Sequence, residues 1–203
     1  MNPVRRAWLC VPAVTGLVWA TVLAESAASA SVLVGDSHDV AALERAVARA
    51  PADPELHELL ALSFANDVER ASGPEQVREL KQALAMRPIS PYTWANLAAA
   101  QYRAGVTGET FQVALERASQ LGPNEPAVQG IVALYGLAVL DEVRPQTRAA
   151  IGRMLAAGMK SDPAAMLQIA QRRGRLDVAC HYVDASRLAG DLSKLCNTRG
   201  AIQ

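Results

Sequence analysis

The sequence predicts an all-α protein, and three observations support this prediction. Ala, Leu, Arg, Glu and Gln, which are strong helix formers, are abundant among the 203 residues, and aromatic residues make up only 4%. No segment alternates β-branched or aromatic residues with polar ones at the period of two that marks a strand. Pairs of prolines recur along the chain at intervals of 37 and 35 residues, which indicates a repeated unit of structure.

Residues 1–30 have the features of a signal peptide or of an amino-terminal membrane anchor. Arg5 and Arg6 precede an uncharged stretch over residues 7–24, and residues 28–30 have the small-x-small form that signal peptidase needs. Eighteen apolar residues are also just enough to span a bilayer. The sequence leaves cleavage and anchoring open, together with a buried apolar helix of a cytosolic protein. The positive charges place the amino terminus in the cytoplasm and the rest of the chain outside. We expect a periplasmic protein, free or anchored in the inner membrane through residues 7–24, rather than a secreted one.

Residues 37–143 are expected to form helical hairpins that share one proline pattern. The first proline of each pair stops a helix, and the second stands three residues later at the first position of the next helix, where a missing N–H costs nothing. Asp53 and Ser90 can cap the helices that follow, and the charge of Glu125 suits a helix amino terminus. An alanine five residues before each first proline lets two helices approach closely. The pairs are Pro51/Pro54, Pro88/Pro91 and Pro123/Pro126, with Ala46, Ala83 and Ala118 before them.

The middle unit resembles the tetratricopeptide repeat, whose first helix carries the motif W-x2-L-G-x2-Y. Trp94, Leu97 and Ala98 match its first three positions, Tyr102 stands one residue past the fourth, and Gly105 matches the turn between the two helices. The first and third units match less closely, with His57, Leu60, Ala61 and Phe64, and with Gln129, Val132, Ala133 and Gly136, in register. The resemblance implies a right-handed α-solenoid of about three to four hairpins.

The resemblance also implies where such a protein binds a partner. The first helices of the hairpins line a groove, which here would present Asn96, Gln101 and Arg103 to a bound peptide. Trp94 and Tyr102, two helical turns apart, are expected to pack in the core. Binding would use helix-in-groove or extended-peptide contacts.

Residues 144–203 are expected to form a degenerate hairpin that caps the array, because terminal units of a solenoid depart from the pattern. Pro145 and Pro163 begin helices, Gly174 makes a turn, and a short helix starts near Asp191. In an oxidising compartment, Cys180 and Cys196 favour one disulfide. Two reduced buried thiols and a zinc site that includes His181 are the alternatives.

The net charge of zero conceals an asymmetry along the chain. Residues 25–143 carry 16 acidic and 8 basic side chains, and residues 144–203 carry 4 acidic and 10 basic ones. Arg172, Arg173 and Arg175 surround the predicted turn at Gly174, where they can bind phosphate, an anionic glycan or lipid headgroups. The alternative is that they are solvated bases at the carboxyl end of a helix.

No catalytic, cofactor or metal motif is evident, so we predict a protein that is not an enzyme and uses no cofactor. His57 begins like a zinc-protease helix, but Ala61 stands where the second histidine is required, and His57 is expected on a helix surface. Asp141 and Glu142 are more simply solvated charges at a turn than an acid/base pair. An exported, neutral chain is not expected to bind nucleic acid.

The predicted function is a non-enzymatic adaptor or scaffold that holds another envelope protein or peptide. The layout of the segments TWANLA, LERASQLGPNEPAVQ, TRAAIGRML and RGRLDVAC is similar to that of membrane-linked accessory proteins of bacterial polysaccharide biosynthesis and export. Two alternatives stay open. One is a glycan- or polyanion-binding or enzymatic accessory protein that uses the basic carboxyl-terminal half, and the other is a membrane-tethered structural spacer.

Overall fold

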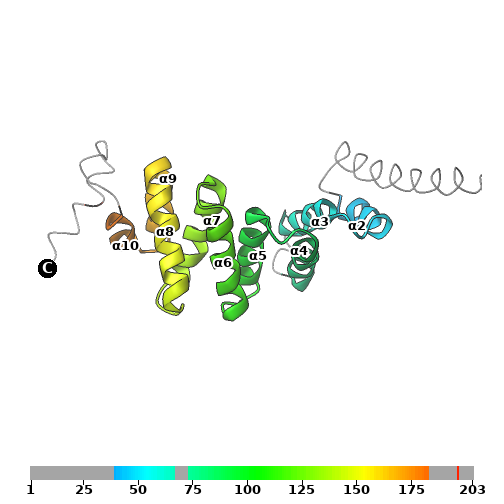
Figure 1. Cartoon of the computed structure of the whole chain (residues 1–203), viewed down its shortest axis with the longest axis horizontal. Coiled ribbons are helices and arrows are strands. Elements are labelled where there is room, and N and C mark those ends of the chain that lie inside the picture. The colour runs from blue at the N-terminus through cyan, green and yellow to red at the C-terminus, as the bar shows by residue number, and fades with distance from the viewer. Residues whose placement is uncertain (1–38, 67–72, 183–195, 197–203) are drawn as a thin grey trace, which may run out of the picture.

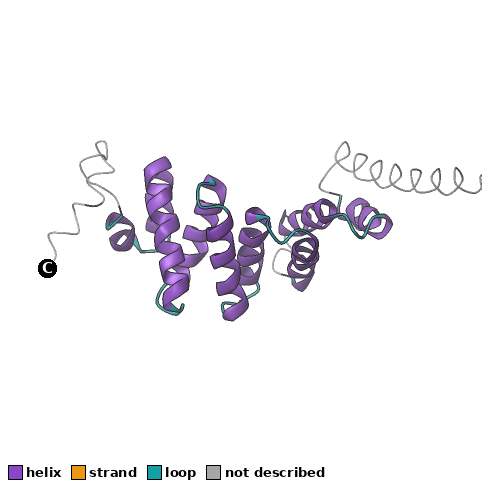
Figure 2. Cartoon of the chain, viewed as in Figure 1, coloured by secondary structure: helices purple, strands orange, loops and turns teal. Residues whose placement is uncertain are grey.

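The computed structural model describes residues 39–66, 73–182 and 196, and all regular structure in these ranges is helical (Figure 2). The prediction of an all-α chain is therefore confirmed for them. None of their helices has the length and apolar character needed to cross a membrane. The predicted leader, residues 1–30, lies outside the described ranges. The helices are α2 (Val40–Arg49), α3 (Pro54–Asn66), α4 (Pro74–Met86), α5 (Pro91–Arg103), α6 (Glu109–Leu121), α7 (Pro126–Gly136), the 3-10 turn η1 (Leu137–Val139), α8 (Pro145–Ser161), α9 (Pro163–Arg172) and α10 (Leu176–Cys180).

Proline begins six of these helices, α3, α4, α5, α7, α8 and α9, as the paired prolines predict for three of them. The capping residues differ among the helices. Asp53 accepts a hydrogen bond from the backbone N–H of Glu55 at 2.9 Å, and the Ser90 hydroxyl accepts one from the N–H of Thr93 at 3.3 Å. Glu125 makes no side-chain cap, and its carboxylate accepts a hydrogen bond from the Tyr92 hydroxyl instead.

Glycines in the left-handed region end α5 and α9. Gly105 has a φ of 74° and Gly174 a φ of 67°, values that a residue with a Cβ rarely adopts. After α5, the N–H of Val106 donates to the carbonyl of Gln101 at 2.8 Å and that of Gly105 to the carbonyl of Tyr102 at 3.0 Å. This paired arrangement satisfies carbonyls that the helix end would otherwise leave open and turns the chain sharply.

The helices follow one another along the long axis of the molecule in chain order (Figure 1). Each packs against the next, and α5 also packs on α7, α6 on α8 and α7 on α9. The helix α4 does not pack on α6 in the same way. The array is therefore closely stacked from α5 to α9, whereas α4 lacks this second contact with α6.

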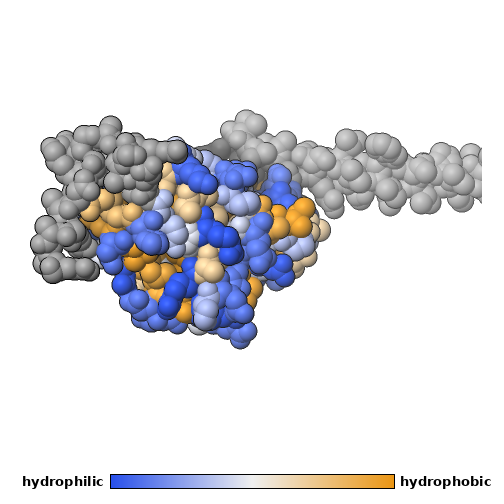
Figure 3. All heavy atoms as spheres, turned by 60° about the vertical axis from the view of Figure 1, so that its left-hand side comes forward, coloured by the Kyte–Doolittle hydropathy of each residue, from blue (hydrophilic) through white to orange (hydrophobic). Residues whose placement is uncertain are grey.

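One large hydrophobic core runs from Ala61 in α3 to Ala179 in α10, and two small clusters join α2 to α3. The three alanines before the prolines are buried, as their spacing predicts: Ala46 is 3% exposed, and Ala83 and Ala118 are fully buried. The chain has few aromatic residues, and its helices pack closely through small side chains instead. On the face shown in Figure 3, hydrophilic residues predominate and apolar ones form separate patches.

A disulfide joins Cys180, the last residue of α10, to Cys196, with 5.5 Å between their Cα atoms. This is the pairing that the sequence favours, and it leaves neither thiol available for zinc. Both cysteines pack against the main core. The short helix expected from Asp191 lies outside the described residues.

Candidate functional site on helix α5

The helix α5 presents its predicted binding residues on two different faces. With 3.6 residues per turn, Trp94, Leu97 and Gln101 share one face, while Asn96 and Arg103, seven residues apart, share another. Gln101 follows Asn96 by five residues and so lies about 140° around the helix from it. The three residues predicted for one groove therefore do not line a single surface.

The face with Gln101 borders an apolar cleft between α4 and α6, here called the α4–α6 cleft. Its volume is about 510 Å³, within the range of about 300 to 1,000 Å³ typical of ligand sites. The helix α5 forms its floor, and α4 and the first turns of α6 form its walls. The lining residues are Lys81, Leu84 and Ala85 of α4, Trp94, Leu97 and Gln101 of α5, and Glu109, Thr110 and Val113 of α6.

Gln101 supplies the polar group of the cleft floor. Its side chain is only 2% exposed, and its Nε2 donates a hydrogen bond to the Thr110 hydroxyl at 2.9 Å. Its carbonyl oxygen, Oε1, is buried and has no hydrogen-bond partner. An unpaired buried acceptor costs about 1 to 3 kcal/mol, a penalty that a bound donor would remove. Gln101 therefore holds an unpaired, buried acceptor at the floor of the cleft.

Trp94 gives the cleft an apolar floor. Its indole N–H donates to the carbonyl oxygen of Pro88 at 2.8 Å, which uses the only polar group of the ring. The ring packs against the main core and lines the cleft. Trp94 thus contributes hydrophobic contact area and no further hydrogen bond, and the prediction that it packs in the core is correct in part.

The face with Arg103 belongs to a polar and aromatic ladder across α5, α7 and α9, made of Tyr102, Arg103, Tyr135 and Arg173. The Nη1 of Arg103 donates to the Tyr135 hydroxyl at 3.1 Å. The rings of Tyr102 and Tyr135 lie 5.1 Å apart, centroid to centroid, and the Arg173 guanidinium lies 5.6 Å from the first and 5.9 Å from the second. Arg103, predicted for the groove, and Arg173, predicted for anion binding, thus both contact Tyr135.

Both arginines of the ladder also hold neighbouring helices. Arg103 donates through Nη2 to the side-chain oxygen of Gln76 in α4 at 3.0 Å, and Arg173 donates through Nε to the carbonyl of Leu134 in α7 at 2.8 Å. These bonds tie α4 to α5 and α9 to α7. Asn96 lies on the same face of α5 as Arg103 and is partly exposed.

The three arginines near Gly174 have different surroundings. Arg173 is engaged in the ladder, Arg175 forms an ion pair with Asp141, and Arg172 is exposed. The structure therefore leaves Arg172 as the member of the group that is open to a bound anion. Asp141 forms its ion pair with Arg175.

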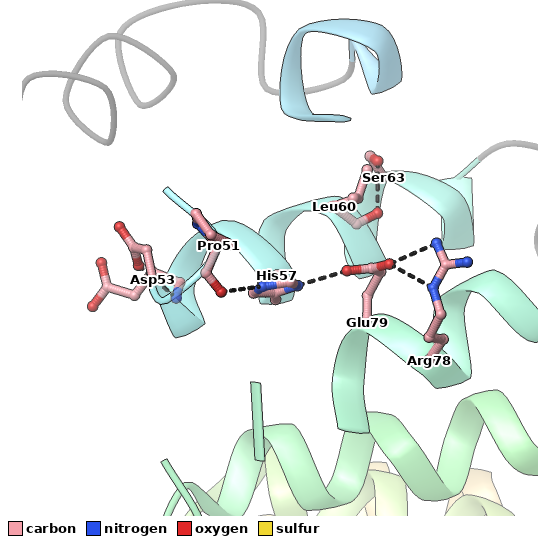
Figure 4. A network of polar contacts seen from close by, with 8 residues as sticks. Pro51, Asp53, His57, Leu60, Ser63, Arg78 and Glu79 are labelled. Atoms are coloured by element: carbon pink, nitrogen blue, oxygen red, sulfur yellow. Dashed lines mark hydrogen bonds and ion pairs between the residues drawn. The ribbon is translucent and has the colours of Figure 1, made fainter. Parts of the chain in front are cut away.

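His57 is buried, which corrects the expectation of a helix-surface residue. It is 6% exposed, and both of its ring nitrogens are paired (Figure 4). Its Nδ1 lies 2.6 Å from Glu79 Oε2, and its Nε2 lies 3.1 Å from the carbonyl oxygen of Pro51. Arg78 donates twice to the other oxygen of Glu79, at 3.0 and 2.8 Å. The reason for burial is visible in the repeat pattern, where His57 occupies the position that Trp94 has in the next unit.

The network around His57 joins α3 to α4. A carbonyl oxygen can only accept, so Nε2 of His57 carries a hydrogen. Arg78, Glu79, His57 and the Pro51 carbonyl thus form one continuous chain of hydrogen bonds. Within the described ranges, no group of three or more His, Cys, Asp and Glu residues could hold a metal ion.

Comparison with known proteins adds no further assignment, since no protein-family model, no curated protein and no solved structure matches the chain.

Proposed function

We propose that this chain is a non-enzymatic adaptor that holds a segment of another protein in the α4–α6 cleft. The observation that carries the proposal is the buried carbonyl oxygen of Gln101, which has no partner and lies in the floor of an apolar cleft. Apolar clefts with a few convergent polar groups are the usual form of binding sites. The surface residues Lys81 and Glu109 at the walls would fix the orientation of the bound segment.

The architecture that we propose is an α-solenoid of about three to four tetratricopeptide-like hairpins. Two observations support it. The helices α5 to α9 pack on their neighbours and on the next helix but one. In addition, His57, Trp94 and Gln129 occupy one motif position, and each has a side-chain nitrogen that bonds the carbonyl of the proline six residues before it. Such arrays serve as binding surfaces.

The setting that we propose is the bacterial cell envelope, with the chain in the periplasm or anchored in the inner membrane and facing the periplasm. The disulfide between Cys180 and Cys196 supports an oxidising compartment. The partner would be another envelope protein, with polysaccharide biosynthesis or export as the favoured pathway. The glycan- or polyanion-binding alternative has weaker support, because Arg173 and Arg175 are already engaged within the chain.

A photo-crosslinking experiment in cells tests the proposal. A photoreactive residue at Ala85, in the cleft wall, should capture one reproducible envelope protein, which mass spectrometry would identify. The same residue at Ala149, an exposed alanine of α8 that lines no part of the cleft, is the matched control and should not capture it. Equal capture from both positions, or none from Ala85, would refute binding in the cleft.

Two substitutions make the test quantitative. Ala85→Arg places a long charged side chain at the mouth of the cleft and should abolish capture from a photoreactive residue at the cleft-lining position Val113, whereas Ala149→Arg should leave it unchanged. Arg172→Ala tests the alternative, because loss of binding to an anionic polysaccharide in this variant would favour the basic half. A spacer would tolerate all three substitutions.

A further inference from the structure

The α4–α6 cleft continues along α4 into a second cavity of about 420 Å³. Lys81 lines both cavities, so the two adjoin at this residue. The second cavity lies between α4 and the turn that joins α5 to α6. Its lining residues are Pro74, Val77, Arg78, Lys81, Gln82, Ala104 and Val106.

The two cavities together form a groove, here called the α4 groove, that follows α4 from Pro74 to Ala85. Eleven helical steps of 1.5 Å give it a length of about 17 Å, which accommodates about five residues of an extended chain. Val106, on the far wall from α4, is 45% exposed and adds apolar surface at the rim. Two cavities in line along one helix suit a polypeptide segment better than a single compact ligand.

The charges of the groove are unevenly placed. Lys81 stands at the middle, is exposed, and forms no ion pair within the described part of the chain. Arg78 is 65% exposed and already binds Glu79. The acidic residue of the opposite wall, Glu109, lies 3.9 Å from Arg144 and is 83% exposed. The wall formed by α4 is therefore basic, with Lys81 free to pair with an acid from outside.

The floor of the α4–α6 cleft favours a different ligand group from the acid that would pair with Lys81. Trp94 and Leu97 offer apolar area, and Gln101 offers an acceptor that lacks a donor. A side chain that satisfies both is aromatic and carries one N–H or O–H at its tip, as Trp and Tyr do. These residues also dominate the binding energy of many interfaces.

We propose that the α4 groove binds a short segment of a partner protein that inserts a Trp or Tyr side chain against Trp94 and Gln101 and places an Asp or Glu beside Lys81. This inference rests on the proposed adaptor function and adds the chemistry of the partner. The aromatic tip donates its hydrogen to Gln101 Oε1, and the acidic residue lies a few residues along the segment.

Selection from a random 12-residue phage-display library on the full-length chain tests this inference. Phage that also bind the Ala85→Arg variant are removed. The enriched peptides should share a Trp or Tyr and an Asp or Glu at one fixed spacing. Synthetic peptides are then titrated by fluorescence anisotropy.

Paired substitutions in the peptide and in the protein test the contact with Gln101 and the contact with Lys81 separately. Replacing the peptide aromatic residue with Phe should weaken binding about tenfold to the wild type and little to Gln101→Met, since each change removes the same hydrogen bond. Lys81→Glu should weaken binding about tenfold, and changing the peptide acid to Lys should restore it. Lys160→Glu, at an exposed lysine of α8, is the matched control and should have no effect. Because Lys81 is exposed, its exchange tests the inference even if Gln101→Met folds poorly.

The outcomes distinguish this inference from the adaptor function. Peptides that require the cleft but share neither an aromatic donor nor an acid would overturn the inference and leave the adaptor function standing. If no peptide is enriched once the phage that bind Ala85→Arg have been removed, both would be overturned.

Discussion

Trp94 donates its indole N–H to the carbonyl oxygen of Pro88, six residues earlier, at 2.8 Å. The same relation recurs in the units before and after it. His57 Nε2 lies 3.1 Å from the carbonyl of Pro51, and Gln129 Nε2 donates to the carbonyl of Pro123 at 2.8 Å. Three unlike side chains thus perform one task, which is to hold the turn before a helix against that helix. Met166 stands three residues after Pro163, which begins α9, as Trp94 stands three residues after Pro91, but its side chain has no N–H to donate.

This recurrence predicts which substitutions Gln129 tolerates. Gln129→Leu should lower the free energy of unfolding by about 1 to 3 kcal/mol, because it leaves the Pro123 carbonyl without its donor. Gln129→His should cost clearly less, since an imidazole performs this task at His57. Urea unfolding followed by circular dichroism measures both values. Equal losses for Leu and His would show that the hydrogen bond is not the stabilising feature.

The buried pair of His57 and Glu79 predicts strong coupling between α3 and α4. Glu79→Ala should destabilise the chain by about 3 to 5 kcal/mol, because it leaves a buried imidazole without its partner. The double variant His57→Leu with Glu79→Ala should cost less than the sum of the two single changes. Arg78→Ala is the control: its side chain is 65% exposed, and we expect about 1 kcal/mol or less. Additive single and double changes would contradict the coupling between His57 and Glu79.

The local features of this fold were predictable from short stretches of sequence, because their causes are local. A proline after Asp53 or Ser90 indicates where a helix starts, and Gly105 indicates where one ends. The alanine before each first proline predicts close packing by its size alone. The burial of His57 also follows from the register that it shares with Trp94.

The candidate site could not be predicted in the same way, because it depends on contacts between distant residues. Arg103 reaches Tyr135, 32 residues away, and Arg173 reaches Leu134 across 39 residues. The five-residue spacing alone places Gln101 and Asn96 on different faces of α5, but which of these faces borders a cleft depends on how α5 packs against α4 and α6. The opening between α4 and α6 likewise results from packing and has no short sequence signature.

The ion pair between Glu116 and Arg144 predicts a pH dependence of stability. Burial raises the pKa of Glu116, but hydrogen bonds from Arg144 and Thr147 and the charge of Arg144 outweigh it and leave the pKa below the ordinary 4.5. A carboxyl whose pKa is lowered by folding stabilises the fold above pH 4.5, and this contribution is lost as the pH falls through the lower folded value. The difference in melting temperature between wild type and Glu116→Gln should therefore be largest near pH 7 and shrink below pH 4.5.

A matched carboxylate separates this effect from general acid denaturation. Glu109 lies 3.9 Å from the same arginine but is 83% exposed. Glu109→Gln should change the melting temperature little, and by a similar amount at every pH. A difference between wild type and Glu116→Gln that stays constant from pH 7 to pH 3 would contradict the role assigned to the Glu116 charge.

Two glycines should respond to alanine in opposite directions. Gly105 has a φ of 74°, so Gly105→Ala should destabilise the chain by about 1 to 2 kcal/mol. Gly130 lies inside α7, where an added Cβ would sit 4.0 Å from Ile169 Cδ1, an ordinary contact. Gly130→Ala should stabilise by about 0.5 to 1 kcal/mol. Chemical denaturation of both variants tests the pair, and a stabilising Gly105→Ala would contradict the turn geometry.

The ladder predicts that two adjacent arginines contribute very differently to stability. Arg173→Ala removes the contacts with the rings of Tyr102 and Tyr135 and the hydrogen bond to the Leu134 carbonyl, and should cost about 1 to 3 kcal/mol. Arg172→Ala, at an exposed position, should stay within about 0.5 kcal/mol of the wild type. Urea unfolding measures the difference. Similar values for the two variants would mean that Arg173 does not hold α9 to α7. Arg173 would then again be a candidate for binding an anionic ligand.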